Sequence, residues 1–311
     1  MNTTKSLSAI DGILLLNKSE GLSSNTALQK VKRLFGARKA GHTGSLDPLA
    51  TGMLPICFGE ATKICHYLLH ADKAYETTGV LGIKTNTSDS TGEIISQTQD
   101  FFVSEPELMV VLEQYKGNSK QVPSMFSALK HQGTPLYKLA RKGIEIERKA
   151  RDIEISQLQL DRFEASQFAL TVRCSKGTYI RNLVEDIGDA LGVGAHVSRL
   201  HRIYTSGFED MPMYGLDALE AMTQAQRLEV LLPMDRAVSY LRSVTLSKTE
   251  VLTIRQGRII SSALLPEDTE CVRLYDDNLQ LVGLGNLYTN GDIKPKRLLS
   301  FNASTAFEQT D

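Results

Sequence analysis

A strand pattern that runs directly into a helix pattern is the feature that most restricts the fold of this chain. From Phe168 to Cys174, large apolar residues occupy every second position, as in a strand with one buried face. Gly177 interrupts this alternation. From 180 to 191, apolar residues recur at helical spacing, and Gly192 follows as an end signal. This part of the chain must therefore pack a helix against a sheet.

Other segments add strands and helices without the regular βαβ order of a doubly wound sheet. The apolar run Gly12 to Leu16 predicts a buried strand, and the ranges 73–83, 152–160 and 271–284 are further candidates. One helix is expected to begin at Ser23 or Ser24 and to end at Gly36, and another to cover 60–70. The second would bury Ile64, Cys65, Leu68 and Leu69. Together these patterns predict an α+β fold.

The periodic pattern of apolar residues breaks near residues 233–245 and a new one begins. Ser247 and Glu250 have the spacing of a capping box, which predicts a new helix start. Short strand candidates follow this helix. We therefore predict two domains, a larger one over 1–238 and a small β-rich one over 239–311.

Composition places the chain among ordinary globular proteins, since 41% of its 311 residues are hydrophobic and 23% are charged. Its four cysteines form no CxxC pair, which favours a reducing compartment. The sequence shows neither a signal-peptide core nor a run of about 18 apolar residues, so a cytoplasmic location without membrane spanning is expected.

The net charge of −1 gives no support to nucleic-acid binding by itself. However, basic residues gather in 30–39 and in 130–151. These clusters predict either two solvated helix faces, the simpler interpretation, or surfaces that bind phosphate.

Several common catalytic motifs are missing from the sequence: a phosphate loop, GxGxxG after a strand, HExxH and GxSxG. The nearest metal candidate is Cys65, His66 and His70. On a helix, His66 would point about 100° away from Cys65, so no metal site is expected there.

The segment from Gly41 to Gly52 has three glycines and no sustained period, which predicts a loop. Within it, Asp47 precedes Pro48, and the proline keeps the aspartate out of helical geometry. An ordinary Asp-Pro turn is the simpler interpretation of these residues alone.

A series of motifs changes this interpretation. GHTGSLDPLATGMLP begins at Gly41 and continues to GEATK at 59–63. Before and after it, in order, come GILLLNK at 12–18, KAY at 73–75 with Asp89, QVPSMFSALK at 121–130, LYKLAR at 136–141, CSKGTYIRNL at 174–183 and LHR at 200–202. In this order they resemble the TruB family of tRNA pseudouridine synthases over residues 11 to about 236. The C-terminal segment is similar, more loosely, to a PUA-like RNA-binding module.

The resemblance implies a pseudouridine synthase fold, with a mixed and largely antiparallel sheet flanked by helices, followed by a β-rich PUA-like domain. It implies an enzyme that flips uridine 55 out of the T loop of tRNA, cleaves its glycosidic bond and rejoins the base through C5. The expected partner is the tRNA T stem-loop, without a metal or other cofactor, and the expected protein is a monomer.

The family match also implies roles for single residues. Asp47 would be the catalytic nucleophile or base, and Arg181 would pair with it and favour its charged form. Tyr75 would pack on the target base and take part in removing the C5 proton, although stacking is the safer role because an ordinary phenol is a weak base at neutral pH. Without the family match, Arg181 would be read as a surface cation at a helix start.

The substrate-binding set implied by the resemblance is larger. Tyr179 and Leu200 would sandwich the flipped base, and His42 would stack among displaced loop bases. Lys18 is included in the same set because it matches a lysine of a family motif, although the role of that lysine in the family looks structural. The expected phosphate contacts are Arg141, Lys142, Arg202 and the 30–39 cluster.

Four positions depart from the usual family pattern, namely Ser19, Asn86, Ser124 and Phe126. None of them replaces the aspartate, the arginine or the tyrosine of the expected site. Two other functions stay open from sequence: a tRNA-binding or tRNA-folding protein without catalysis, and a metal-dependent RNA hydrolase. The second lacks a clustered carboxylate or histidine site in the sequence.

Overall fold

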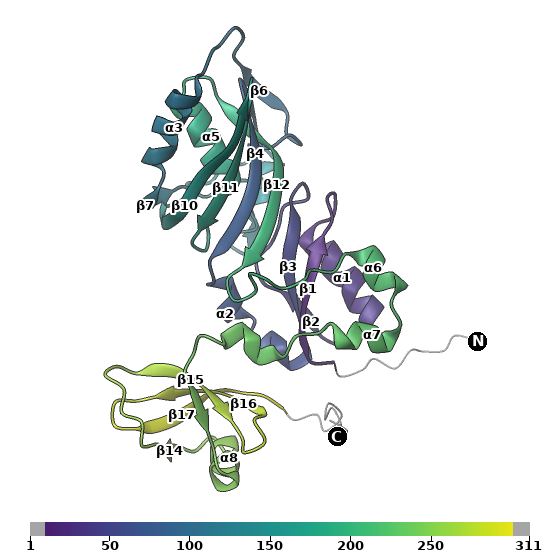
Figure 1. Cartoon of the computed structure of the whole chain (residues 1–311), viewed down its shortest axis with the longest axis vertical. Helices are drawn as coiled ribbons and strands as arrows, with labels where there is room; N and C mark the ends of the chain where they lie inside the picture. Colours follow the sequence, from purple (N-terminus) through teal and green to yellow (C-terminus); the bar gives the residue numbers. More distant parts are fainter. Residues whose placement is uncertain (1–9, 301–311) are drawn as a thin grey trace, which may run out of the picture.

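The computed structural model describes residues 10–300, which form a large unit around one sheet and a smaller C-terminal unit around another (Figure 1). The strands of the main sheet are β1 (Gly12–Lys18), β2 (Ala40–His42), β3 (Thr51–Phe58), β4 (Lys73–Leu81), β7 (Gly117–Gln121), β10 (Arg151–Glu164), β11 (Gln167–Cys174) and β12 (Ala195–Thr205). The helices of this unit are α1 (Ser24–Phe35), α2 (His66–Leu69), α3 (Glu105–Gln114), α4 (Leu136–Ala140), α5 (Ile180–Ala190), α6 (Leu216–Ala221) and α7 (Gln224–Glu229), with short 3-10 helices η1 (Gly59–Lys63) and η2 (Met234–Val238). Two small hairpins complete it, β5 (Ile83–Thr85) with β6 (Ile94–Gln97), and β8 (Lys130–His131) with β9 (Thr134–Pro135).

The main sheet has the strand order β1-β3-β12-β4-β11-β10-β7, with β2 paired to β3. Its neighbouring strands run antiparallel except for β3 and β12, which run parallel. Helices α3 and α5 lie against one end of the sheet, and α1, α6 and α7 lie beside β1 (Figure 1). The α+β prediction with a mixed, largely antiparallel sheet is confirmed.

Strand β1 is buried on both faces, which explains its unbroken apolar sequence. Leu14 and Leu16 belong to the large core that includes α1 and α5. Ile13 and Leu15 face the opposite way and share a second core with Leu284 of the C-terminal unit. Both faces of β1 therefore exclude water, and the second core extends from β1 into the C-terminal unit.

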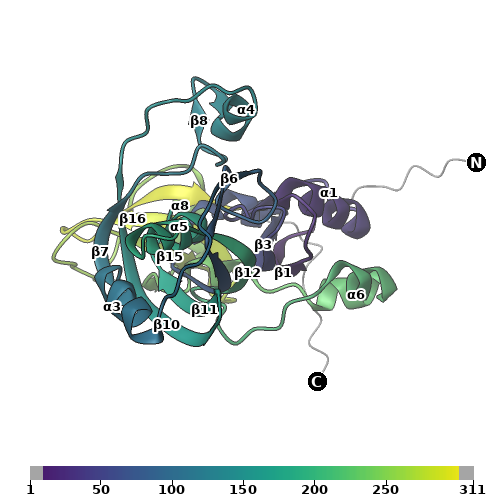
Figure 2. The ribbon, with the colours of Figure 1, turned by 90° about the horizontal axis from the view of Figure 1, so that it is seen from above.

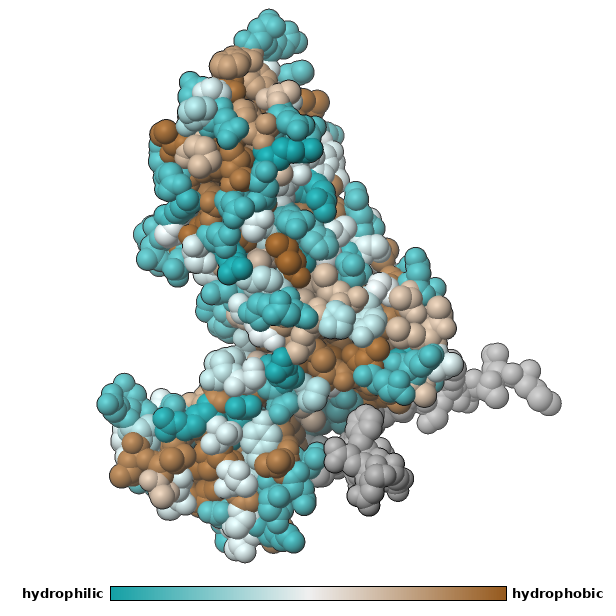
Figure 3. Space-filling view, in the orientation of Figure 1, coloured by the Kyte–Doolittle hydropathy of each residue, from teal (hydrophilic) through white to brown (hydrophobic). Residues whose placement is uncertain are grey.

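The C-terminal unit has the strand order β13-β15-β16-β17-β14. Its elements are β13 (Ser243–Thr245), α8 (Lys248–Arg255), β14 (Ile260–Ser261), β15 (Glu270–Tyr275), β16 (Leu281–Leu287) and β17 (Asp292–Leu298). The predicted capping box of Ser247 and Glu250 begins α8. Figure 3 shows that the two units meet over a limited area, with the surface hollowed beside the contact.

The prediction of one helix over 60–70 is wrong. The segment forms η1 and the short α2, and Leu69 is 44% exposed although the helical pattern would bury it. Tertiary contacts fix η1 instead, because Asp11 accepts a hydrogen bond from the Glu60 N–H at 2.6 Å and Glu60 accepts one from the backbone of Ser300. Packing against the C-terminal unit therefore overrides the local helical period.

Three strand and loop boundaries also differ from the predictions. The range 271–284 holds two strands, because Asp276 accepts hydrogen bonds from the N–H groups of Asn278 and Gln280 and turns the chain. The range 73–83 ends at Leu81, and β5 begins at Ile83. The predicted loop from 41 to 52 is shorter at both ends, since β2 takes in residues 41 and 42 and β3 begins at 51.

Residues 122–150 form an insertion between the edge strand β7 and its partner β10. They carry β8, β9 and α4, and Figure 2 shows that this segment projects from the body of the molecule. Arg141 and Lys142 are exposed on it. The insertion thus presents a basic surface on a segment that is joined to the sheet only through its two stems.

Within residues 10–300, no helix has the length and apolar character needed to cross a membrane.

Candidate active site

Asp47 lies in the loop between β2 and β3, and side chains of the β1–α1 region fix this loop. Ser23 caps α1 by accepting a hydrogen bond from the Thr26 N–H, which leaves Ser24 free for another role. The Ser24 hydroxyl accepts from the Leu46 N–H at 2.7 Å and donates to the Leu46 carbonyl at 2.9 Å. The residue before Asp47 is therefore held on both sides of its backbone.

Lys18, placed by motif among the substrate-binding residues with a role that looks structural, lies buried beneath the same region. Its side chain is fully buried, and its Nζ donates to the carbonyls of Ser19 at 2.9 Å and Leu22 at 2.7 Å. Burial lowers its pKa to about 8, against the opposing effect of the Asp47 carboxylate. Lys18 therefore supports the loop and cannot reach an RNA at the surface.

Arg202, expected as a phosphate contact, lies in the interior instead of on the surface. Arg202 is 1% exposed, and its guanidinium donates to the carbonyls of Met53 at 2.6 Å and Gly44 at 3.1 Å. The backbone of Gly52 has φ +98°, and a Cβ there would lie 2.2 Å from the Arg202 carbonyl oxygen. Glycine at 52 thus permits β3 to approach β12 so closely that Arg202 can reach the Asp47 loop.

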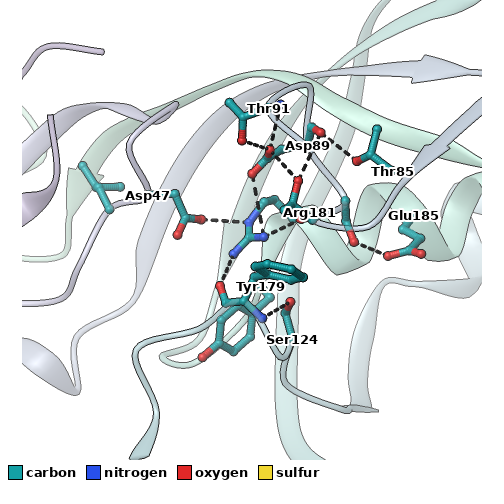
Figure 4. Close-up of polar contacts among 12 residues, drawn as sticks. Asp47, Thr85, Asp89, Thr91, Ser124, Tyr179, Arg181 and Glu185 are labelled. Atoms are coloured by element: carbon teal, nitrogen blue, oxygen red, sulfur yellow. Dashed lines mark hydrogen bonds and ion pairs between the residues drawn. The ribbon is translucent and has the colours of Figure 1, made fainter. Parts of the chain in front are cut away.

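Arg181 and Asp47 form the centre of the site (Figure 4). The Nε of Arg181 donates to Oδ2 of Asp47 at 2.8 Å. The arginine side chain is 3% exposed, whereas that of the aspartate is 38% exposed. A buried guanidinium therefore anchors a carboxylate that remains accessible from solvent. The alternative interpretation of Arg181 as a surface cation is wrong.

Two backbone carbonyls hold the other side of the guanidinium. Arg181 donates through Nη1 to the Thr87 carbonyl and through Nη2 to the Phe126 carbonyl at 2.8 Å. Because a guanidinium is planar, these contacts fix the direction in which Nε points toward Asp47.

A second carboxylate, Asp89, approaches Arg181 at a different nitrogen from Asp47, from above in Figure 4. Its Oδ2 is 3.7 Å from Nη1 of Arg181, and its side chain is 6% exposed. Thr87 and Thr91 donate hydroxyl hydrogen bonds to its Oδ1 at 2.9 and 2.6 Å. In the sequence Asp89 stands within a family motif but carries no predicted role, and its place in that motif is the only signal for it.

Tyr75 and Leu200 line the core beside this pair. Both belong to the main core, with exposed fractions of 9% and 6%, and they lie on the adjacent strands β4 and β12. Burial raises the pKa of Tyr75, and the nearby Arg202 acts in the opposite direction. The Tyr75 hydroxyl is therefore protonated at neutral pH, which fits a packing surface better than a base.

Tyr179 and His42 are half-buried near the same loop. Burial raises the pKa of Tyr179, whose environment includes both Asp47 and Arg181. Burial, followed by the positive charge of Arg202, lowers the pKa of His42. A neutral imidazole with an apolar face suits stacking on a base.

The basic residues of the insertion stand apart from this cluster. Arg141 lies over the ring of Tyr137 at 5.5 Å and stays exposed, as does Lys142. Of the basic 30–39 segment, Lys30, Arg33, Arg38 and Lys39 are exposed. The structure therefore brings Asp47, Arg181, Tyr75 and Tyr179 into one region, and leaves these cations on outer surfaces.

The metal candidate from the sequence is used in other contacts. Cys65 donates to the Thr62 carbonyl at 3.2 Å, the ring of His66 lies 4.2 Å from that of Tyr67, and Nδ1 of His70 contacts Nζ of Lys176 at 2.5 Å. Over residues 10–300, no group of three or more His, Cys, Asp or Glu side chains has an arrangement that could hold a metal ion.

Comparison with known proteins extends over nearly the whole chain. Residues 32–180 match the TruB family pseudouridylate synthase N-terminal domain, 181–239 match the tRNA pseudouridylate synthase B C-terminal domain, and 243–299 match the pseudouridine synthase II TruB C-terminal domain. A tRNA pseudouridine synthase B of Legionella pneumophila is 63% identical over 301 residues, which cover 97% of this chain and 99% of that protein. One of Shewanella denitrificans is 47% identical over 96% of this chain and 97% of its own length.

Solved structures show the same fold at lower identity. A Cbf5-Nop10-Gar1 complex has a chain with a TM-score of 0.70 and 23% identity, covering 92% of this chain and 84% of that one. The structure of an H/ACA RNP bound to a substrate RNA containing 2'-deoxyuridine has a chain with a TM-score of 0.69 and 21% identity, covering 93% and 85%. The fold, the order of the motifs and the near full-length identity lead to one conclusion: the chain belongs to the TruB family of pseudouridine synthases.

Proposed function

We propose that this protein isomerises uridine to pseudouridine at position 55 in the T loop of tRNA. The observation that carries the proposal is the accessible Asp47 carboxylate held at 2.8 Å by the buried Arg181 guanidinium. The names of its relatives, tRNA pseudouridine synthase B, support the substrate class.

The reaction requires the base to leave its stack before the enzyme can reach it. Asp47 would then act on the base or the sugar as nucleophile or base, and either role requires an ionised carboxylate. Arg181 favours that charged form through a charge-assisted hydrogen bond. The glycosidic bond breaks, the base is rejoined through C5, and loss of the C5 proton completes the isomerisation.

The walls of the site would hold the flipped base. Tyr75 and Leu200 offer an aromatic and an aliphatic surface from adjacent strands, and Tyr179 approaches from the start of α5. Stacking of a base on such a surface contributes about 1–3 kcal/mol. His42 would stack among the bases that the flip displaces. Arg141, Lys142 and the exposed members of the 30–39 cluster would contact phosphates.

The domain assignment belongs to the same proposal, with a catalytic domain over 1–238 and a PUA-like RNA-binding domain over 239–311. The C-terminal sheet begins at Ser243, a few residues after the proposed boundary. A monomer and a cytoplasmic location also stay predictions. Sedimentation of the protein with and without tRNA tests the first, and cell fractionation tests the second.

Tritium release from tRNA transcripts labelled at uridine C5 tests the function. The wild type should release tritium, and Asp47→Asn should abolish release while the variant still binds tRNA. A transcript with cytidine at position 55 should give no release. Asp235→Asn is a matched control, because Asp235 accepts a hydrogen bond from Tyr275 at 2.7 Å away from the loop, and it should keep activity.

The same experiment separates the two other candidate functions. Tight tRNA binding without tritium release by the wild type would favour a binding or folding protein. Cleavage of the transcript that stops in chelator would favour a metal-dependent hydrolase.

A further inference from the structure

Gln121 makes a two-sided hydrogen bond to the backbone at the start of α5. Its Oε1 accepts from the Tyr179 N–H at 2.7 Å, and its Nε2 donates to the Tyr179 carbonyl at 3.1 Å. Gln121 is 7% exposed, so neither bond competes freely with water. One amide side chain therefore satisfies both backbone groups of a single residue.

Tyr179 is a sensitive point for such a contact. It is the N-cap of α5 and has no side-chain cap of its own, with φ −100° and ψ 107°. Its carbonyl also accepts the first hydrogen bond of the helix, from the Leu183 N–H at 3.1 Å. Arg181 lies two residues further on in the same turn, so the position of the Tyr179 backbone determines where the Arg181 side chain starts.

Gln121 is also the last residue of β7, where the insertion leaves the sheet opposite Arg151. The next residues of this stem are tied to the same helical turn. Asn182 donates to the Val122 carbonyl at 3.1 Å, and Arg181 donates to the Phe126 carbonyl at 2.8 Å. An open pocket of about 470 Å³ also lies between this stem, the insertion and α5.

We propose that Gln121 is a positioning residue for the Arg181–Asp47 pair: it holds the backbone of Tyr179 and thereby the place from which the Arg181 side chain starts. This inference rests on the proposed function, because its effect is read in the same reaction. Displacement of a catalytic contact by about 1 Å can reduce a rate by about a hundredfold. Loss of both Gln121 bonds should therefore act on the rate of chemistry before it acts on tRNA binding.

The test compares Gln121→Met, which keeps the length of the side chain and removes both bonds, with Gln121→Glu, which keeps the acceptor for the Tyr179 N–H. Under single-turnover conditions the Met variant should react at least about tenfold more slowly than wild type, with tRNA affinity within about threefold. The Glu variant should lie between the two. Gln224→Met is the matched control, because Gln224 donates to the Phe35 carbonyl at 3.1 Å far from α5, and it should keep the wild-type rate.

A double-mutant cycle separates positioning from general loss of structure. In an Arg181→Lys background, Gln121→Met should lower the single-turnover rate by less than about twofold, because the guanidinium that Gln121 positions is gone. Equal losses in both backgrounds, or a wild-type rate for Gln121→Met, would overturn the inference. A wild type that binds tRNA but releases no tritium would instead refute the proposed function. The melting temperature of each variant shows whether it is folded during the assay.

Discussion

Nε of Arg181 and Oδ2 of Asp47 lie 2.8 Å apart although 134 positions separate the two residues in the sequence. The arginine is buried between two carboxylates, and only the Asp47 carboxylate is accessible. This difference in exposure assigns different tasks to the two aspartates. Asp89 pairs with the guanidinium in the protein interior. The Asp47 carboxylate stays accessible, so one of its oxygens can contact a substrate.

Two substitutions of Arg181 should separate the effect of its positive charge from the effect of its planar hydrogen-bond geometry. Arg181→Met leaves the Asp89 carboxylate buried and two carbonyls without a donor, and should lower the free energy of unfolding by about 3–5 kcal/mol. Arg181→Lys should lose less stability but most of the activity, because an ammonium cannot reproduce the planar contacts. Urea unfolding and tritium release measure both. Arg162→Met serves as control, because the exposed Arg162–Glu164 pair at 3.7 Å contributes at most about 1 kcal/mol.

Arg202→Met should destabilise the fold rather than weaken RNA binding. It removes the donors to the Met53 and Gly44 carbonyls, each of which costs about 1–3 kcal/mol when buried without a partner. Urea unfolding should show a loss of at least about 2 kcal/mol. If stability were unchanged while the salt dependence of tRNA binding fell, Arg202 would be a phosphate contact after all.

The double variant Arg141→Ala, Lys142→Ala should behave in the opposite way. Both side chains are exposed on the insertion, so the melting temperature should stay within about 2 °C of wild type. Each phosphate contact that is lost reduces the slope of log affinity against log salt by about 0.7–0.9. Filter binding of tRNA across a salt series measures the slope. Lys116→Ala is the control at the end of α3, where Lys116 pairs with Glu113, and an equal change there would contradict the assignment.

Asp186→Asn should make the protein more stable at neutral pH. Although Asp186 is exposed at the surface, partial desolvation, followed by the charges of Glu185 and Asp189, raises its pKa to about 6. Because the folded-state pKa lies above the ordinary value, the folded state binds the proton more tightly, and stability is lost as pH rises from about 4 to above 6. Asparagine avoids this loss. Relative to wild type, the free energy of unfolding of the variant should be higher by up to about 1 kcal/mol at pH 7.5, after allowance for solvent screening, and unchanged at pH 4.

Thermal unfolding at both pH values checks this prediction, with Asp152→Asn as a control of opposite sign. The hydrogen bond from Lys120 lowers the pKa of Asp152, so its carboxylate is favoured in the folded state and its removal should not stabilise the protein at pH 7.5. An Asp186→Asn variant with the same advantage at both pH values would point to packing rather than charge.

Elements with local signals could be predicted from the sequence. The alternation at 168–174, the helical period after 180, the α1 boundary at Gly36 and the Ser247 capping box all recur in the structure. Each depends on residues within one or two turns, where period and backbone preference decide the outcome. The order of motifs likewise predicted the family.

The roles of the charged residues, in contrast, depend on tertiary packing. Arg202 resembles a phosphate contact in sequence, but both it and Lys18 are buried and donate to backbone carbonyls of the Asp47 loop. Asp89, which the sequence left without a role, contacts Arg181 from the inside. Burial and orientation depend on residues that are distant in the chain, such as Gly52 beneath Arg202. A cation becomes a surface contact or an internal support according to the strands that pack around it, and no local pattern carries that information.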